Sequence, residues 1–439
     1  MLFIQKWRRV FTDRIEQLNV EYCNSALNGE TIVSRLPFRL LNGLAHLVIF
    51  VGKEIVRFPS RPRKAKIIAC VGSYNHHKSF HFAFASRDDT QLATFHNFRH
   101  AGAPHVGLLF CYLTGALFVI LLPFIWLLLD RSIVRNFALV RLDQFVLGLG
   151  NRYFVRRFLR KSGAEVLLVF SNLQVYNHIL IEEANKLGIV SVFATHAPVG
   201  RGQRELTTDF ALLDGDWQAS IYPPSSTEKL ITGSARGMQL VVQRLNRSNA
   251  TGIIVATNSL TRDLAAIEHF IGLIKERYPT TPIKLRPHPA DIDRREQHRL
   301  ICQRQGTKFS DPKEPLVLPD EDYKYLATAM SGVLTDAALI GLYPLIVRSP
   351  EIDLVTSKLP HDYYGLIELG LAKSINLNDP HLPKHWKIGT ELEKLDLAAR
   401  QDWDAQKAMN EALNAIVDKQ LLTNSTYYFK DHQSDKNPR

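Results

Sequence analysis

Short apolar runs that alternate with helical patterns are the feature that most constrains how this 439-residue chain can fold. Runs of this kind are typical of strands buried in a parallel sheet, and the segments between them are long enough for crossover helices. The alternation starts again after Arg236, so it predicts an α/β fold of two Rossmann-like domains that face a cleft. The expected strands are residues 66–72, 165–171, 189–195, 210–213 and 229–232 in the first domain and 252–257, 282–285, 332–334 and 345–347 in the second.

The same pattern divides the chain into four regions. We expect an N-terminal helical, membrane-proximal region at residues 1–64, followed by a Rossmann-like domain at 65–235 that contains an apolar insertion. A second Rossmann-like domain is expected at 236–390. Residues 391–439 are expected to form a C-terminal helix and a disordered tail, because the end of the chain is polar.

The apolar insertion, residues 106–129, contains no charged residue. About 20 apolar residues suffice for a helix to span a bilayer, whereas Pro123 would kink or interrupt such a helix. Three interpretations stay open: a spanning helix, a re-entrant or interfacial helix, and a helix buried in the protein core. Arg99 before the insertion and Arg131 after it give no inside–outside asymmetry, so we expect membrane association without translocation.

The chain has an excess of basic residues, with a formal net charge of +11 and a pI of about 9.4. Such an excess points to an acidic partner, which is a nucleic acid, an anionic lipid or a phosphorylated substrate. The basic residues recur in short clusters without stacking aromatic residues, so an anionic membrane surface is favoured over nucleic acid. The start of the chain lacks the ordered regions of a secretory signal, which favours a cytoplasmic, peripheral or monotopic protein.

The run Arg286-Pro287-His288-Pro289 follows an expected strand of the second domain. The two prolines make it a stiff, extended loop that presents a guanidinium and an imidazole, groups suited to a phosphate. Further along, Ser331 precedes Thr335 and Asp336, which are expected to open an apolar helix after a short strand. The N–H groups at such a helix start favour an anion, so we expect these residues to complete a nucleotide or phosphate site.

Polar residues also follow strands of the first domain, where ligands bind in open parallel sheets. His196 comes after the third strand, and an imidazole with a pKa near neutrality can act as a general base. Asp214 and Asp216 after the fourth strand are the alternative base, unless they only cap a turn, and the choice stays open. The residues expected to line an acceptor cleft after the first strand are Ser73, Asn75, His76 and His77.

Neither a metal site nor a dinucleotide site is indicated. The adjacent His76 and His77 lack a third ligand at a useful spacing, and no phosphate-loop or dinucleotide fingerprint is present. The four cysteines lie far apart without C-x-x-C spacing, which argues against a zinc site or a disulfide framework.

The RPHPAD run at 286–291, together with Thr335-Asp336 after it, resembles bacterial glycosyltransferases of GT-B architecture that carry an HP motif. These families include sialyltransferases, capsule Kdo-transferases and CDP-glycerol glycerophosphotransferases, and the resemblance covers residues 164–371. It implies that His288 contacts the donor nucleotide or its phosphate and that His196 is the base. The chain departs from the pattern at Ala337-Ala338, where a pair of serines is often found.

The resemblance implies a metal-independent transferase without a cofactor, which moves a sugar or polyol phosphate from a CMP- or CDP-linked donor. The acceptor would be a growing surface polysaccharide or a lipid-linked precursor at the cytoplasmic face of the inner membrane. The first Rossmann-like domain would then hold the acceptor, and the second would hold the nucleotide donor. The alternative, favoured by Ala337-Ala338, is a non-catalytic GT-B-like protein that binds or regulates a polysaccharide assembly machine.

Overall fold

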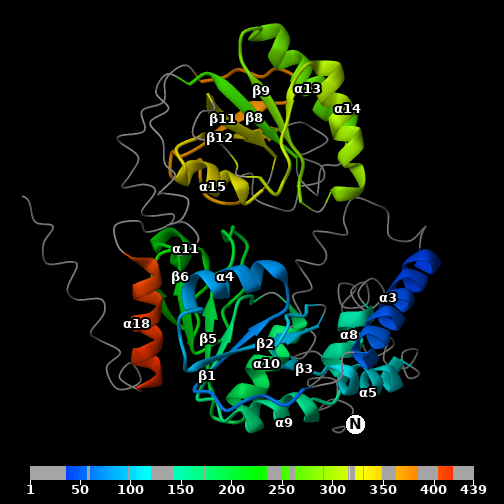
Figure 1. Cartoon of the computed structure of the whole chain (residues 1–439), viewed down its shortest axis with the longest axis vertical. Helices are drawn as coiled ribbons and strands as arrows, with labels where there is room; N and C mark the ends of the chain where they lie inside the picture. Colours follow the sequence, from blue (N-terminus) through cyan, green and yellow to red (C-terminus); the bar gives the residue numbers. More distant parts are fainter. Residues whose placement is uncertain are drawn as a thin grey trace, which may run out of the picture.

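The computed structural model describes residues 36–56, 60–96, 98–119, 142–172, 174–234, 250–257, 263–289, 291–314, 316, 322–329, 331–348, 362–383 and 404–418. Within them the chain forms a seven-stranded and a six-stranded sheet, and every strand pair is parallel (Figure 1). One sheet lies within residues 67–231 and the other within residues 252–376. The domain limits at 65–235 and 236–390 stay predictions.

The N-terminal sheet has the strand order β3-β2-β1-β4-β5-β6-β7, which is that of a doubly wound Rossmann fold. Every residue of β1, β4 and β6 is buried, because helices cover both faces of the sheet. The strands are β1 (Ile67–Val71), β2 (Thr90–Phe95), β3 (His105–Val106), β4 (Val166–Val169), β5 (Val190–Ala194), β6 (Phe210–Leu213) and β7 (Glu228–Ile231). The helices are α3 (Leu36–Val56), α4 (Tyr74–Phe84), α5 (Leu109–Val119), α8 (Leu142–Leu149), α9 (Tyr153–Ser162), α10 (Val175–Asn185) and α11 (Asp216–Ile221).

The C-terminal sheet has the order β10-β9-β8-β11-β12-β13, so it repeats the doubly wound arrangement. In both sheets the order reverses at one point, between β1 and β4 and between β8 and β11, and ligands of such folds bind at the carboxyl ends there. The strands are β8 (Gly252–Ala256), β9 (Ile283–Arg286), β10 (Lys308–Phe309), β11 (Tyr323–Thr328), β12 (Tyr343–Arg348) and β13 (Lys373–Asn376). The helices are α13 (Leu264–Arg277), α14 (Arg295–Gln305), which follows a 3-10 turn at Ile292–Arg294, and α15 (Val333–Leu339).

Helix α18 (Ala405–Val417) follows the C-terminal sheet in the sequence but packs against the N-terminal domain (Figure 1). Its residues Met409 and Leu413 are buried in one apolar cluster with Phe80 and Phe84 of α4. The side-chain amide of Asn410 donates to the Ala83 carbonyl at 2.9 Å. The chain therefore crosses back to its first domain, and α18 belongs to the core of that domain.

The two domains also touch through a loop after β5 and the segment before β13. The backbone N–H of Arg201 donates to the Tyr363 carbonyl at 2.6 Å, and the Arg201 guanidinium forms an ion pair with Glu368. Gly365 has a positive φ of 68° and lies against the indole of Trp217, where a Cβ would overlap the ring. These contacts fix two Rossmann-like domains around a common cleft, the arrangement that the GT-B resemblance implies.

The apolar runs predicted most strands correctly, and one prediction is wrong. The expected strand at 332–334 is the start of α15, and the strand of this region is β11 at Tyr323–Thr328. Tyr323, Lys324 and Tyr325 give β11 a mixed polar and aromatic sequence, so it lacks the apolar run of its neighbours. Thr335 and Asp336 therefore lie inside a helix, at its third and fourth positions, and do not follow a strand directly.

The described part of the apolar insertion consists of Val106 in β3 and helix α5, and residues 120–129 lie outside the described residues. Helix α5 packs tightly on α8, since a Cβ at Gly115 would overlap the Val146 carbonyl oxygen. Among the helices of the described residues, none combines the length and apolar character that crossing a bilayer requires. Of the predicted terminal regions, residues 1–35, 391–403 and 419–439 also lie outside the described residues.

Candidate functional site

A cavity of about 560 Å³, here called the interdomain cavity, lies between the two domains. The start of α4, which follows the carboxyl end of β1, bounds it on one side. The loop after β9 and the turn after β10 bound it on the other side. Its volume falls in the range of small-molecule sites, about 300–1,000 Å³. The lining residues are Tyr74, Asn75, Lys78, Pro287, His288, Pro289, Asp291, Arg295, Asp311, Pro312 and Lys313.

The loop that carries His288 is held in one conformation by its backbone. The N–H of His288 donates to the Thr257 hydroxyl at 2.7 Å, and the N–H of Thr257 donates to the Arg286 carbonyl at 2.9 Å. The carbonyl of His288 in turn accepts from the N–H of Asp291 at 2.9 Å. Because Thr257 follows β8, the strand next to the switch point, these bonds fix His288 at the ligand-binding edge of the sheet.

Arg286 has a different place from the one expected. Its guanidinium donates to the Ser310 hydroxyl at 2.8 Å and to the carbonyls of Asp311, Pro312 and Glu314 at 3.1, 3.0 and 2.7 Å. The expectation that Arg286 holds a donor phosphate is not met by this arrangement, since four donor bonds are directed at the protein. Arg286 instead shapes the turn at 310–314, which forms one wall of the interdomain cavity.

The start of α4 brings only one of the four expected acceptor residues, Asn75, to the interdomain cavity. Ser73 is the N-cap of the helix, and its hydroxyl accepts from the N–H of His76 at 3.2 Å. His77 turns toward His100, with their ring centroids 4.3 Å apart. The residues that accompany Asn75 on the cavity are Tyr74 and Lys78.

Sequence reasoning missed these two residues because residues 73–78 follow a glycine and appear loop-like. In the helix, positions 74, 75 and 78 share one face, as residues three and four apart do. The Lys78 ammonium lies 4.9 Å from the centre of the Tyr74 ring, which holds the cation at the cavity. A serine cap ahead of this segment was the signal that could have shown the helix.

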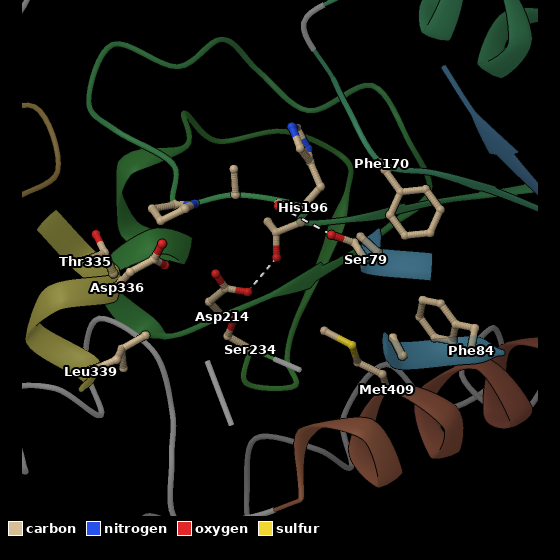
Figure 2. Close-up of a pocket in the computed structure, with 15 residues that line it drawn as sticks. Ser79, Phe84, Phe170, His196, Asp214, Ser234, Thr335, Asp336, Leu339 and Met409 are labelled. Carbon is tan, nitrogen blue, oxygen red and sulfur yellow. Dashed lines mark hydrogen bonds between the residues drawn. The ribbon is translucent and has the colours of Figure 1, made fainter. Parts of the chain in front are cut away.

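A second, smaller cavity is lined in part by His196 and is called the His196 cavity (Figure 2). It brings together residues far apart in the sequence: Asp214 from the N-terminal domain and Thr335 and Asp336 from the C-terminal domain. Ser79, one residue after Lys78 in α4, also lines it, so this helix borders both cavities. The volume of about 30 Å³ has room for a hydroxyl group or a few waters, so the His196 cavity admits at most the reacting end of an acceptor.

His196 is half-buried and packs against His76, with ring centroids 4.5 Å apart and ring planes at 72°. The Nδ1 atom of His76 accepts a hydrogen bond from the N–H of Gly72 at 3.3 Å. Burial, with His196 as the smaller cause, lowers the pKa of His76 to about 2. His76 therefore stays neutral with its proton on Nε2, and it is a buried neighbour of His196 and does not line either cavity.

The two candidate aspartates differ in position. Asp214 is buried in the His196 cavity, where it accepts from the Thr195 hydroxyl at 2.6 Å (Figure 2). Its backbone N–H donates to the side-chain carbonyl of Gln218 at 2.6 Å. Asp216 is exposed at the first position of α11 and lines neither cavity. Of the two, only Asp214 is placed to act as the alternative base.

Helix α15 explains the departure at Ala337-Ala338. Both alanines are buried in the apolar cluster of the C-terminal domain, with 0% and 2% of their surface exposed. A serine hydroxyl at either position would lie in that core, so the alanines remove no group from the two cavities. Ser331 lies ahead of the helix, and its hydroxyl accepts from the N–H of Val333 at 3.4 Å.

Among the described residues, no three side chains of His, Cys, Asp or Glu are grouped so that they could hold a metal ion. The three described cysteines, Cys70, Cys111 and Cys302, are buried and unpaired by disulfides. Burial raises the pKa of the Cys70 and Cys111 thiols to about 12 in each case, so these thiols stay protonated.

No protein-family model matches the sequence, and no curated protein matches it. Several solved structures are similar in shape. The S. aureus MnaA–UDP structure is 12% identical with a TM-score of 0.44 and covers 82% of this chain and 97% of its own. Acinetobacter baumannii MurG is 11% identical with a TM-score of 0.42, and the match covers 80% of this chain and 100% of MurG. The Methanocaldococcus jannaschii UDP-GlcNAc 2-epimerase in complex with UDP-GlcNAc and UDP is 12% identical with a TM-score of 0.42. That match covers 80% of this chain and 99% of the epimerase chain. Identities and TM-scores this low assign no activity, so the fold stands on the strand order of the two sheets.

Proposed function

We propose that the chain is a metal-independent glycosyltransferase, or a glycerophosphotransferase-like enzyme, that uses a nucleotide-activated donor. One observation supports this most directly: the His288 loop, which backbone hydrogen bonds connect to Thr257, faces the polar start of α4 across a cavity of about 560 Å³. A nucleoside phosphate needs a cleft of this size with cations and hydrogen-bond donors at its phosphate end. The donor is a CMP- or CDP-linked sugar or polyol phosphate, and no other cofactor takes part.

Three cations line the interdomain cavity, and because Arg295 forms an ion pair with Asp311, Lys78 and Lys313 supply most of the charge for a donor phosphate. Lys313 and Arg295 come from the C-terminal domain and Lys78 from the N-terminal domain. Together with His288 they stabilise the negative charge that develops on the leaving nucleotide. Because Lys78 is on the opposite domain, a bound donor is held from both sides of the cleft.

The acceptor hydroxyl enters from the His196 cavity. Its oxygen forms the new bond at the sugar carbon or polyol phosphorus, while the bond to the nucleotide phosphate breaks and the nucleotide leaves with the electron pair. His196 takes the proton, with Asp214 as the alternative base. Thr335 and Asp336 line the His196 cavity, where the Thr335 hydroxyl is the group proposed to hold the phosphate. The N–H groups at the start of α15 already donate to Ser331 and Gly332, so Ser331 acts by shaping this turn.

The acceptor in this proposal is a growing surface polysaccharide or a lipid-linked precursor at the cytoplasmic face of the inner membrane. The net charge of +11 suits both an anionic membrane and a phosphorylated acceptor. Nucleic acid is not a partner in this proposal.

A second candidate is a nucleotide-binding protein of the same assembly machine that carries out no transfer. Two observations favour it: the bonds of Arg286 are directed into the turn at 310–314, and Asp291 and Asp311 add negative charge to the cavity wall. It predicts nucleotide binding without release of nucleotide from any donor.

Ligand-detected NMR on the intact protein with CMP, CDP, UDP and GDP tests the proposal. We expect one of these nucleotides to bind, and His288→Ala to abolish the signal. His269→Ala, an exposed histidine on α13, is the matched control and is expected to bind as the unmodified protein does. Folded protein that binds none of the four nucleotides would contradict both candidates.

A further inference from the structure

Exposed apolar side chains are concentrated on one part of the surface. Among the described residues, nine of the eleven large apolar side chains that are exposed lie on three helices, five on α3, two on α5 and two on α9. Single exposed apolar residues are ordinary on a protein surface, but a large group of them marks an interaction site. The outward sides of α3, α5 and α9 are called here the apolar helical face.

The three helices contact one another in series. Helix α3 packs against α5 and α8, and Phe110 of α5 meets Phe154 of α9 edge to face with ring centroids 5.3 Å apart. A buried carboxylate joins the first two helices, because Glu54 of α3 accepts from the N–H of Leu108 at 2.8 Å, just before α5 begins. The face is therefore built into the fold by specific contacts.

The exposed positions on these helices follow helical periodicity. On α5 the exposed leucines are Leu113 and Leu117, four residues apart, and on α3 Val48 and Ile55 are seven residues apart. The inward sides of the same helices are mostly apolar as well, as Leu47 and Tyr112 show, with Glu54 as the one buried carboxylate. A helix that is apolar on both sides is suited to a buried or membrane environment and is poorly suited to water.

The exposed charges within the three helices have one sign. The sequences of α3, α5 and α9 contain one acidic residue, Glu54, and it is buried. The exposed side of α9 begins with Tyr153 and Phe154 and continues with Arg157, Arg160 and Lys161. Aromatic residues next to cations are typical of a surface that enters the boundary of an anionic bilayer.

We propose that the apolar helical face docks onto an anionic phospholipid bilayer. The exposed residues of α3 and α5 enter the acyl boundary, and the basic part of α9 contacts lipid phosphates. The sequence that follows α5, residues 120–129, is the rest of the uncharged insertion, so the apolar character continues at the same place in the chain. This inference deepens the proposed function, on which it rests for its lipid-linked acceptor, by naming the surface that meets the membrane.

The position of this face has a consequence for the cleft. In Figure 1 α5 and α9 lie on the side of the N-terminal domain away from the C-terminal domain, and α3 lies along the flank of the N-terminal domain. A bilayer that meets α5 and α9 leaves the C-terminal domain in water, where a soluble nucleotide donor reaches it. The acceptor domain is the one that lies on the lipid.

Flotation of the intact protein with vesicles tests the proposal. We compare phosphatidylcholine vesicles with vesicles that also contain phosphatidylglycerol, and we measure the bound fraction of each variant. The variant Leu113→Ser/Leu117→Ser is expected to bind anionic vesicles about tenfold more weakly. The matched control Leu300→Ser changes a leucine that is 50% exposed, close to the 48% of Leu113, but lies on α14 of the other domain. It is expected to bind as the unmodified protein does.

A second variant tests the electrostatic part. Arg157→Gln/Arg160→Gln/Lys161→Gln is expected to lose the preference for phosphatidylglycerol and the salt dependence of binding. Equal binding of the leucine variant and the unmodified protein, or no binding to either vesicle, would overturn the proposal.

Two further measurements separate the remaining outcomes. A dimer in sedimentation that Leu113→Ser/Leu117→Ser converts to a monomer would show that a second copy covers the face, and would overturn the proposal. The nucleotide signal in NMR is recorded for the same variants, and we expect it to be unchanged. A protein that binds nucleotide but not vesicles loses only this inference, whereas one that binds vesicles but not nucleotide loses only the proposed function.

Discussion

The two domains have the same strand order around their central strands, yet the helices that cover them meet different surroundings. In the N-terminal domain the outer helices α3, α5 and α9 expose apolar side chains, whereas Leu300 is the one exposed large apolar side chain among the described residues of the C-terminal domain. The edges that face the cleft differ as well, since one is the start of a helix and the other is a proline-fixed loop. A shared topology therefore leaves each domain free to take a separate task, because the task depends on surface residues and loops.

The largest expected effect separates chemistry from donor binding. Exchanging His196 for alanine should lower the rate of transfer by about 10²–10⁴-fold, the contribution of a general base, while nucleotide binding is kept. His288→Ala should instead weaken nucleotide binding. Steady-state transfer assays and nucleotide titrations on both variants check the division. If Asp214→Asn lowers the rate and His196→Ala does not, Asp214 is the base.

The next effect tests whether α18 belongs to the N-terminal domain. Leu413 is fully buried against that domain, so Leu413→Ala should reduce the free energy of unfolding by about 2–5 kcal/mol. Hydrogen exchange measured as the temperature rises should show that the backbone amides of the seven-stranded sheet lose protection. Protection that falls only in the six-stranded sheet would mean that the helix stabilises the other domain.

A pair of glycine substitutions compares the helical layers directly. Gly115 of α5 has no room for a Cβ beside Val146, so Gly115→Ala should destabilise the protein by about 1–3 kcal/mol. Gly272 of α13 has open space around it, so Gly272→Ala should stabilise the helix by about 0.5–1 kcal/mol. Chemical denaturation of both variants measures these changes. Effects of the same sign would remove the contrast between a tightly packed and an open helical layer.

Acid should affect the N-terminal domain first. Burial lowers the pKa of His76 to about 2 and that of His178 to about 4, and both lie in this domain. The unfolded state takes up a proton on each histidine below about pH 6.5, whereas the folded state does not until its own lower pKa. Stability is therefore present above pH 6.5 and falls by about 1.4 kcal/mol per pH unit for each histidine as the pH drops below it.

Denaturation curves between pH 7 and pH 5 measure this slope, with His76→Asn as the variant in which one contribution is removed. If the free energy of unfolding depends on pH equally in the variant and in the unmodified protein, His76 has the same charge in the folded and the unfolded state over this range. This result would contradict the burial account.

The sequence allowed the fold class to be predicted, because strands such as β1 and β4 are short apolar runs between helical patterns. It did not reveal β11, since Tyr323, Lys324 and Tyr325 give that strand a mixed pattern. At the site, the two prolines predicted a stiff loop around His288, and the stiffness of that loop stays a prediction. The direction of the Arg286 side chain could not be predicted, because the carbonyls of the turn at 310–314 that accept its hydrogen bonds come from a part of the chain with no apolar pattern.

The polar start of α4 is the other instructive case. Tyr74 and Lys78 reach the interdomain cavity only because residues 74–84 are helical, and a polar sequence after a glycine predicts a loop equally well. Burial of His76 depends in the same way on packing with Phe170, which is distant in the sequence. Long-range packing decides both features, and periodicity within one segment does not contain that information.

The most direct test of the central claim is a crystal structure of the protein with the nucleotide that the NMR screen selects. We predict that the nucleotide occupies the interdomain cavity, with its phosphate beside His288 and within hydrogen-bonding distance of Lys78, Arg295 or Lys313. A nucleotide bound at another place, with the interdomain cavity unchanged, would contradict the account of the cleft.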